Sequence, residues 1–167
     1  WNIPNQNITS AGTSINSGKL PASIKRIEWE PGTVNVDIGG GKFNNVTDTL
    51  KSKGVTNHIF DPFNRDVAHN LTVRNSVSGG RADTATINNV LNVIAEPSNR
   101  MNVIKQAADA VGSDGVAYFL IYEGNKSGVG KSTSKGFQMN RPARDFMGEI
   151  REQFSDVQRS GNMITAK

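Results

Sequence analysis

The chain has 167 residues, of which 35% are hydrophobic and 20% charged, a length and composition expected of one folded globular domain. The absence of cysteine excludes disulfides and thiolate metal sites, and there is no apolar run of the roughly 18 residues that a membrane span needs. We therefore expect a soluble cytoplasmic protein without a metal site, whose net charge of +4 is compatible with a nucleic-acid partner.

Residues 1–33 are expected to form an arm and a lead-in to the main domain. The first eighteen residues are rich in Asn, Ser, Thr and Gly, a composition typical of loosely ordered segments. Ile24 and Ile27 are spaced to share one face of a helical turn, and Pro31-Gly32 indicates a turn before the first strand. The folded domain is predicted over 34–167.

From Val34 onward, strand-like and helix-like segments alternate. Strands are expected over 34–38, 57–60, 85–94 (with the exit from the strand) and 116–122, and helices over 45–53, 66–77, 97–111 and 142–154. The segment 66–77 also fits a strand, although we prefer a helix. Val157 and Met163-Ile164 flank Ser160-Gly161-Asn162, a pattern typical of a hairpin. The sequence thus predicts a single α/β domain: an open, mostly parallel sheet with helices on both faces and a C-terminal antiparallel hairpin.

The most informative stretch is 34–61. A β-branched run carries Asp37 and leads into Gly39–Gly41, and a second apolar run ends at Asp61 about 20 residues further on, as in a nucleotide-binding βαβ unit. Glycines let the backbone turn sharply and approach a ligand, and a carboxylate at the tip of the second strand can accept hydrogen bonds from ribose hydroxyls. Asn44 stands where a dinucleotide fingerprint has its third glycine, which disfavours pyrophosphate. The alternative is an ordinary glycine-rich turn.

The pattern Asp37-x-Gly39-x-Gly41 resembles the first motif of the class I, Rossmann-like methyltransferases that use S-adenosylmethionine, and Asp61 matches that family's ribose-binding acid. The resemblance implies this cofactor and methyl transfer, with one strand–helix unit fewer than usual between Asp66 and Asp83. Asp37 would position the methionine amine. The cofactor-binding residues implied are Asp37, Gly39, Gly40, Gly41, Asp61, Pro62, Asn88 and Asn89.

The segment 83–92 occupies the position of the family's fourth motif, next to the switch point where open α/β sheets bind ligands. We expect Asn89 and Asn92 to line the transfer site, and Glu123, at the end of the next strand, to accept a proton or orient an acceptor amine. These three predicted catalytic residues could instead cap strands and loops. The Asp/Asn/Ser-Pro-Pro-aromatic signature of amino-methylating DNA enzymes is absent here.

The loop between Gly124 and Arg144 carries five cations and no acid. Basic side chains with an aromatic ring suit a phosphodiester backbone and an unstacked base, so nucleic acid is the expected methyl acceptor, and a solvated loop or a small-molecule acceptor is the alternative. The predicted substrate-binding residues are Lys126, Lys131, Lys135, Phe137 and Arg141.

Two further classes stay open. One is a module that keeps the cofactor pocket but has lost the transfer activity. The other is a nucleotide-binding protein, because the segment 128–133 (Gly-Val-Gly-Lys-Ser-Thr) imitates a phosphate-binding P-loop. Asn125 stands where that motif needs a glycine, and the sequence gives no convincing helix after the loop.

Overall fold

A computed structural model describes residues 1–3, 18–133 and 136–167, and it confirms the predicted α/β architecture. One six-stranded sheet has the order β2-β1-β3-β4-β8-β7, and β5 and β6 form a separate antiparallel hairpin. The strands are β1 (Val34–Ile38), β2 (Thr56–Phe60), β3 (Thr84–Asn88), β4 (Val116–Leu120), β5 (Lys131–Thr133), β6 (Gly136–Gln138), β7 (Val157–Ser160) and β8 (Met163–Ala166). The helices are α1 (Ala22–Arg26), α2 (Asn45–Ser52), α3 (Val67–Val77), α4 (Pro97–Val111) and α5 (Met147–Arg151), with short 3-10 helices η1 (Leu91–Val93) and η2 (Ala143–Phe146).

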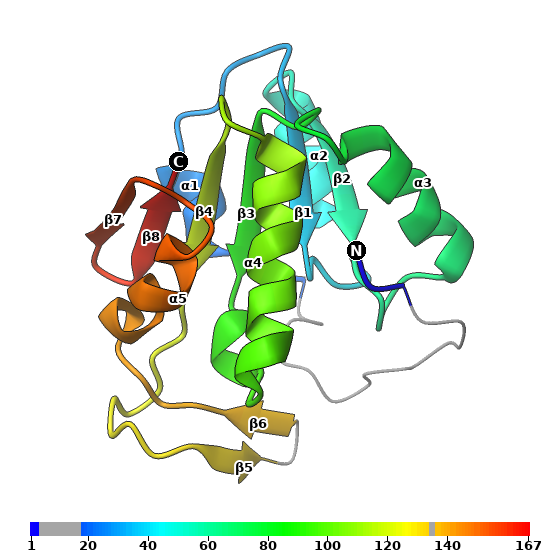
Figure 1. Cartoon of the computed structure of the whole chain (residues 1–167). Helices are drawn as coiled ribbons and strands as arrows, with labels where there is room; N and C mark the ends of the chain where they lie inside the picture. Colours follow the sequence, from blue (N-terminus) through cyan, green and yellow to red (C-terminus); the bar gives the residue numbers. More distant parts are fainter. Residues whose placement is uncertain (4–17, 134–135) are drawn as a thin grey trace.

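The helices cover both faces of the sheet. Figure 1 shows α3, α4 and α5 on one face, here called the front, and α1 and α2 on the other, here called the back. Strands β2, β1, β3 and β4 are parallel to one another. At one edge, β8 pairs antiparallel with β4, and β7 pairs antiparallel with β8. Since β2 lies on one side of β1 and β3 lies on the other, the chain reverses its direction across the sheet beside β1. Ligands of open α/β sheets bind at such a switch point.

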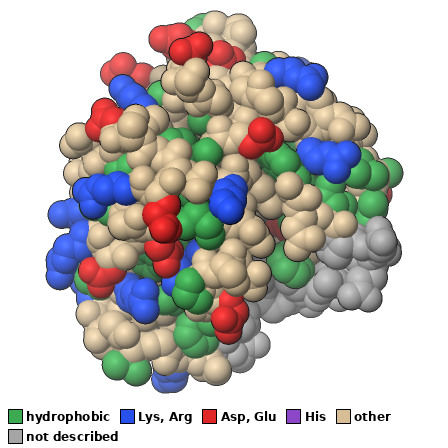
Figure 2. Space-filling view, in the orientation of Figure 1, with side chains coloured by type: hydrophobic (Ala, Val, Ile, Leu, Met, Phe, Trp, Pro, Cys, Tyr) green, Lys and Arg blue, Asp and Glu red, His purple; other side chains and the backbone are tan. Residues whose placement is uncertain are grey.

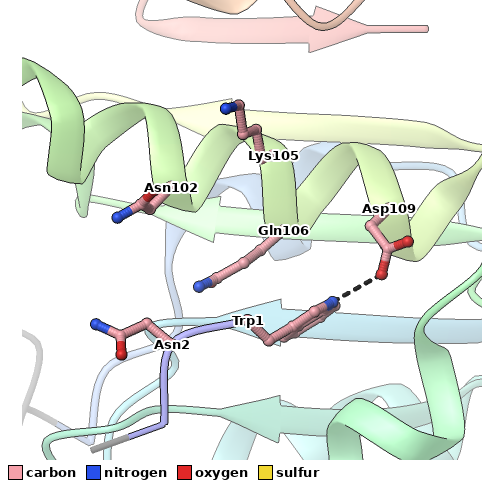
Figure 3. A pocket seen from close by; sticks show the side chains of 6 residues that line it. All are labelled: Trp1, Asn2, Asn102, Lys105, Gln106 and Asp109. Atoms are coloured by element: carbon pink, nitrogen blue, oxygen red, sulfur yellow. Dashed lines mark hydrogen bonds between the residues drawn. The ribbon is translucent and has the colours of Figure 1, made fainter.

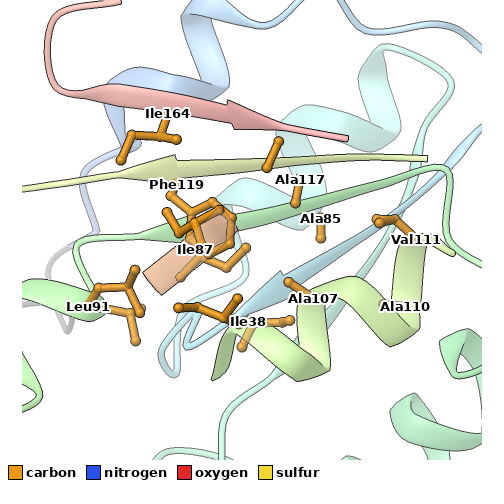
Figure 4. Packing of buried hydrophobic residues seen from close by; sticks show 14 of the residues in the cluster. Ile38, Ala85, Ile87, Leu91, Ala107, Ala110, Val111, Ala117, Phe119 and Ile164 are labelled. Atoms are coloured by element: carbon orange, nitrogen blue, oxygen red, sulfur yellow. The ribbon is translucent and has the colours of Figure 1, made fainter. Parts of the chain in front are cut away.

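The two faces of the central strands differ in chemistry because successive side chains point to opposite faces. Val36 and Ile38 of β1 and Ala85 and Ile87 of β3 belong to the main buried cluster on the front (Figure 4). Small residues of α4 let the helix lie close to these strands, and the further members labelled there are Leu91, Ala107, Ala110, Val111, Ala117, Phe119 and Ile164. The back of the same strands carries polar side chains instead, which are described with the site.

Several boundaries differ from those expected. Strand β4 ends at Leu120 rather than at residue 122, and the helix expected over 142–154 is the short η2 followed by α5, which ends at Arg151. The loop expected between Gly124 and Arg144 contains the β5–β6 hairpin. The preferred helix over 66–77 is α3, and it leads directly from β2, which is an edge strand, to β3.

Among the described residues, no helix combines the length and the apolar character needed to cross a bilayer. The predicted arm has only its ends described. Trp1 packs against the main cluster, and α1 contributes Ile24 to a second buried cluster with Val46, Leu50 and Val55 on the back. Residues 4–17 lie outside the described part of the chain.

Arg100 joins α4 to α5 and to the loop that follows β3. Its guanidinium is 2% exposed and forms an ion pair with Glu149, with a shortest N–O distance of 2.7 Å. The same side chain donates to the carbonyl oxygens of Ile94 and Ala95, at 2.8 and 2.9 Å. These bonds fix the path of the loop at the carboxyl edge of the sheet.

We predict that Arg100→Leu lowers the free energy of unfolding by about 3–5 kcal/mol, because the substitution leaves the carboxylate of Glu149 without its buried partner. Urea unfolding followed by circular dichroism measures the change. Arg151→Leu is the matched control, since Arg151 is exposed and no ion pair is recorded for it among the described residues. Equal stability of the two variants would contradict this role for Arg100.

Candidate functional site

The glycine segment after β1 forms a tight corner at the carboxyl edge of the sheet. Gly39 and Gly41 have φ values of +75° and +80°, a region that L side chains rarely adopt. A Cβ atom on Gly40 would lie 2.6 Å from Oδ2 of Asp37, and one on Gly39 would lie 2.6 Å from a methyl carbon of Val90. The corner therefore requires glycine for its conformation and also for its close approach to the neighbouring side chains.

The carboxylate of Asp37 lies directly under this corner and is 2% exposed. Its Oδ1 atom accepts hydrogen bonds from Thr86, which pairs with Asp37 across the strands, at 2.9 Å, and from the amide of Asn88 at 3.4 Å. No hydrogen bond to Oδ2 is recorded within the described part of the chain. Buried polar atoms are normally paired, whereas Oδ2 faces the glycine corner and has no recorded donor among the described residues.

Burial raises the pKa of Asp37 from 3.8 to about 7, and the negative charge of Asp61 adds to the increase. The hydrogen bonds from Thr86 and Asn88 and the positive charge of Arg65 act in the opposite direction. Desolvation is the largest of these effects, because the carboxylate has lost water without gaining an adjacent cation.

Asp61 has a different environment, although it is also buried. Its Oδ2 accepts from the backbone N–H of Gly41 at 2.8 Å and from the side-chain amide of Asn64 at 2.9 Å. Its Oδ1 accepts from the backbone N–H groups of Phe63 and Asn64 at 2.9 and 3.2 Å. Four hydrogen bonds fill the acceptor capacity of a carboxylate. Asp61 thus holds the glycine corner, and a ribose hydroxyl would have to displace one of these donors.

A small hollow adjoins the corner on the back of the sheet. It is lined by Asp37, Gly39, Gly40 and Asn88, which the sequence predicted, and by five residues that sequence reasoning missed: Lys19, Pro21, Phe43, Asn45 and Val46. The hollow measures about 30 Å³, far below the several hundred Å³ of a typical ligand pocket. Asp61 and Pro62 are not among its lining residues.

Asp37 and Asn88 of this hollow are part of a network of hydrogen-bonded polar side chains on the back of the sheet. Ser23 of α1 donates to Asn88, which in turn donates to Asp37. Asn35 donates to Thr86 at 3.1 Å and to Asn57 of β2 at 2.9 Å. Asn35 and Thr86 belong to no catalytic motif, and only their alternation with apolar residues along β1 and β3 could have placed them on one face. No sequence signal places Ser23 of α1 beside them.

The three predicted catalytic residues have separate environments. Asn89 has a φ of +59° and is half-buried, and no hydrogen bond of its side chain is recorded among the described residues. The side chain of Asn92 is 1% exposed, donates to Gln138 of β6 at 3.1 Å and accepts from the backbone of Tyr122 at 3.3 Å. Glu123 accepts from the N–H of Ala143 at 2.8 Å, at the start of η2. Asn92 and Glu123 thus connect loops.

The four described substrate-binding candidates lie on and beside the β5–β6 hairpin, which Figure 1 shows below the carboxyl ends of the parallel strands. Lys126 and Lys131 are exposed and Arg141 is half-buried. Phe137 is half-buried against the main cluster and lies close to Gly130, so much of its ring is covered. Tyr122, which is 60% exposed, is the more accessible aromatic side chain, and sequence reasoning missed it. Lys135 lies outside the described residues.

The P-loop alternative does not fit the observed backbone. A phosphate-binding loop needs a helix directly after its lysine, whereas Lys131–Thr133 is strand β5. The hairpin is held by Asn140, which has a φ of +56° and whose carbonyl accepts from the N–H of Gly128 at 2.8 Å. A P-loop nucleotide site at this position is therefore rejected.

Comparison with known proteins gives no match to a family model or to a curated protein. Solved structures do match. A TehB-like S-adenosylmethionine-dependent methyltransferase of Corynebacterium glutamicum is 15% identical over 87% of this chain and 84% of its own, with a TM-score of 0.53. A Burkholderia thailandensis 1,6-didemethyltoxoflavin N1-methyltransferase is 16% identical over 81% and 71%, with a TM-score of 0.59. This chain has the class I methyltransferase fold.

At this level of identity, the likeness establishes the methyltransferase fold and leaves the activity to the site. A Rhodobacter sphaeroides chain whose name assigns it provisionally to the zinc-dependent alcohol dehydrogenases also matches, at 10% identity and a TM-score of 0.55. One fold can host several chemistries. The function of this methyltransferase-fold protein therefore has to be argued from Asp37 and the residues around it.

The raised pKa of Asp37 leads to a prediction about stability. The folded protein keeps the Asp37 proton up to about pH 7, whereas the unfolded chain loses it above about pH 4. The folded state therefore binds more protons between these values, and Asp37 makes the wild type progressively less stable as the pH rises through this range.

We predict that Asp37→Asn becomes more stable than the wild type as the pH rises from about 4 to about 7, by a few kcal/mol at most, and that the difference is constant above that range. Urea unfolding at several pH values measures the difference. Asp114→Asn, at an exposed position without a recorded partner, serves as the control. A difference that does not change with pH would show that Asp37 titrates normally.

Proposed function

We propose that this protein is an S-adenosylmethionine-dependent methyltransferase. The observation that carries the proposal is the buried Oδ2 atom of Asp37, which has no recorded partner in the described part of the chain and faces a glycine corner in a methyltransferase fold. A buried carboxylate with one oxygen that no described donor reaches suits a cationic ligand group, whose charge would offset the desolvation of the ionised form. S-adenosylmethionine carries an α-ammonium group and a sulfonium, and it has no phosphate that would need a basic loop.

In this proposal, Asp37 accepts a hydrogen bond from the α-ammonium group, and Gly39 and Gly40 admit the amino-acid tail because they have no side chains. Asn88 lies beside Asp37 in the same hollow. Asn89 directly follows β3, and we propose that it contacts the adenosine or the acceptor. Asp61 keeps Gly41 in place and takes the ribose only by exchanging a hydrogen bond with Asn64.

The bound cofactor would supply a methyl group already activated by the positive sulfonium. The protein would then contribute chiefly by holding the acceptor in line with that methyl group, which requires little acid–base chemistry. The observed roles of Asn92 and Glu123 fit this view: both fix the loops around the carboxyl edge. We propose them as positioning residues.

The volume of about 30 Å³ implies a movement on binding. Lys19, Pro21 and Phe43, of which Phe43 is 39% exposed, line the hollow, and we propose that they form its cover. These are peripheral groups, whereas Asp37 and the glycine corner are fixed by the sheet. We expect the cover to move outward while the corner stays in place.

The expected methyl acceptor remains nucleic acid. The support is local: Tyr122, Lys126 and Lys131 are exposed at the carboxyl edge beside the site, where an aromatic ring and cations suit an unstacked base and its phosphates. Over the front face as a whole, basic and acidic side chains are interspersed (Figure 2). The proposed interface is therefore confined to the hairpin and the adjoining loop.

We predict that calorimetric titration detects binding of S-adenosylhomocysteine to the wild type, and that Asp37→Ala weakens it by roughly tenfold or more, because a charge-assisted hydrogen bond is lost. Asp114→Ala is the control and should bind as the wild type does. The absence of binding by the wild type, or equal binding by Asp37→Ala, would reject the proposed function.

We also predict that the triple variant Lys126→Ala/Lys131→Ala/Arg141→Ala binds single-stranded RNA more weakly, with a logarithmic salt dependence smaller by about 2, since each lost phosphate contact removes about 0.7. Fluorescence anisotropy at several salt concentrations measures both effects.

The matched control replaces Lys51, Lys53 and Arg81, which are exposed near the opposite edge of the sheet. An equal loss in the control variant would show a non-specific charge effect. If neither the wild type nor the variants bind RNA or DNA, a small molecule becomes the favoured acceptor.

A further inference from the structure

A second and larger hollow lies beside α4. It measures about 630 Å³ and is lined by Trp1, Asn2, Asn102, Lys105, Gln106 and Asp109 (Figure 3). None of these residues lines the hollow at Asp37. The four residues from α4 lie on the front of the sheet, whereas Asp37 points to the back, so the two hollows are distinct sites.

The feature that calls for a ligand is Gln106. Its side chain is 7% exposed, and no hydrogen bond to it is recorded among the described residues. Figure 3 shows the amide extending away from α4 into the space beside Trp1 and Asn102. Buried polar groups are almost always hydrogen-bonded. The Gln106 amide therefore offers one donor group and one acceptor, side by side, to a ligand that enters the hollow.

The opposite wall is the indole of Trp1, which is held in a fixed orientation. Its N–H donates to a carboxylate oxygen of Asp109 at 2.7 Å. Its ring meets the ring of Phe60 edge to face, with a centroid distance of 4.9 Å and an interplanar angle of 81°. The hollow thus has one aromatic wall and one amide wall. Lys105, which also lines the hollow, is exposed and has no recorded ion pair within the described ranges.

We propose that this hollow binds a free adenine mononucleotide. A carboxamide presents a donor and an acceptor side by side, which matches the exocyclic amine and ring nitrogen of adenine, whereas guanine offers two acceptors on its corresponding edge. The indole supplies an aromatic surface for the base, and Lys105 supplies a cation for the phosphate. The volume lies within the range of small-molecule pockets.

The intrinsic fluorescence of Trp1 provides a direct measurement. The chain has two tryptophans, and Trp29→Phe leaves Trp1 as the single tryptophan whose fluorescence is followed. Adenosine monophosphate (AMP) is titrated with S-adenosylhomocysteine at saturation, which keeps the Asp37 site filled. We expect a saturable change in Trp1 emission with AMP and a weaker response to guanosine monophosphate.

Variants in the same background separate the contacts. We expect Gln106→Leu to weaken AMP binding by about tenfold or more, and Lys105→Ala to weaken the binding of AMP but not that of adenosine. Lys51→Ala, which removes an exposed lysine on the back of the molecule, should change neither. Gln106→Met provides a second test if the leucine variant fails to fold, and thermal melting identifies that case.

The inference is overturned if AMP leaves Trp1 emission unchanged, if the Gln106 variants bind AMP as tightly as the parent, or if only an adenine-containing oligonucleotide binds. These outcomes do not depend on the proposed methyl transfer. If S-adenosylhomocysteine does not bind, the same titration in an Asp37→Ala background still reports on the second hollow alone.

Discussion

The bond from the backbone N–H of Gly41 to the carboxylate of Asp61 is the constraint on which the site depends. It ties the end of the glycine corner to the tip of β2. Because the N–H of Gly39 also donates to the carbonyl oxygen of Phe60, the corner is held at both ends, and Gly40 is kept close above Oδ2 of Asp37, for which no donor is recorded among the described residues. A side chain at Gly40 would disturb that carboxylate directly.

The two central strands, β1 and β3, carry apolar side chains on the front and polar side chains on the back. On the front, Val36 and Ile87 pack against α4, and burial of apolar surface stabilises the fold. On the back, Thr86 and Asn88 orient Asp37, which opposes stability when it is ionised. A cationic ligand at Asp37 would relieve this cost on binding, so the same buried charge that weakens the free protein favours the complex.

The loops at the carboxyl edge are fixed by buried side chains rather than left open. Asn92 connects the loop after β3 with β6, and Arg100 connects the same loop with α5. The hairpin therefore stands in a defined position beside the site, which suits an acceptor-binding surface. Among the described residues, the proposed cover of Lys19, Pro21 and Phe43 has no comparable set of buried side-chain bonds, and it is the part expected to move.

The sequence by itself determined the elements and the corner, because these depend on local properties. The apolar run of β1, the glycines after it and the spacing to Asp61 were sufficient to predict the βαβ unit and the class I methyltransferase fold. The alternation of helices and strands predicted the mostly parallel sheet. The segment that forms α3 was ambiguous in the sequence, because its apolar residues fit both the helical period and the alternation of a strand.

Only the tertiary structure decided what the side chains do, because their partners come from distant parts of the chain. Asp61 resembles a ribose acceptor in the sequence, yet its oxygens are filled by the backbone of its own turn and of Gly41. Phe137 is half covered by the core, while Tyr122 is exposed. Hydrogen-bond saturation and burial depend on which segments meet in space, and no local pattern records that.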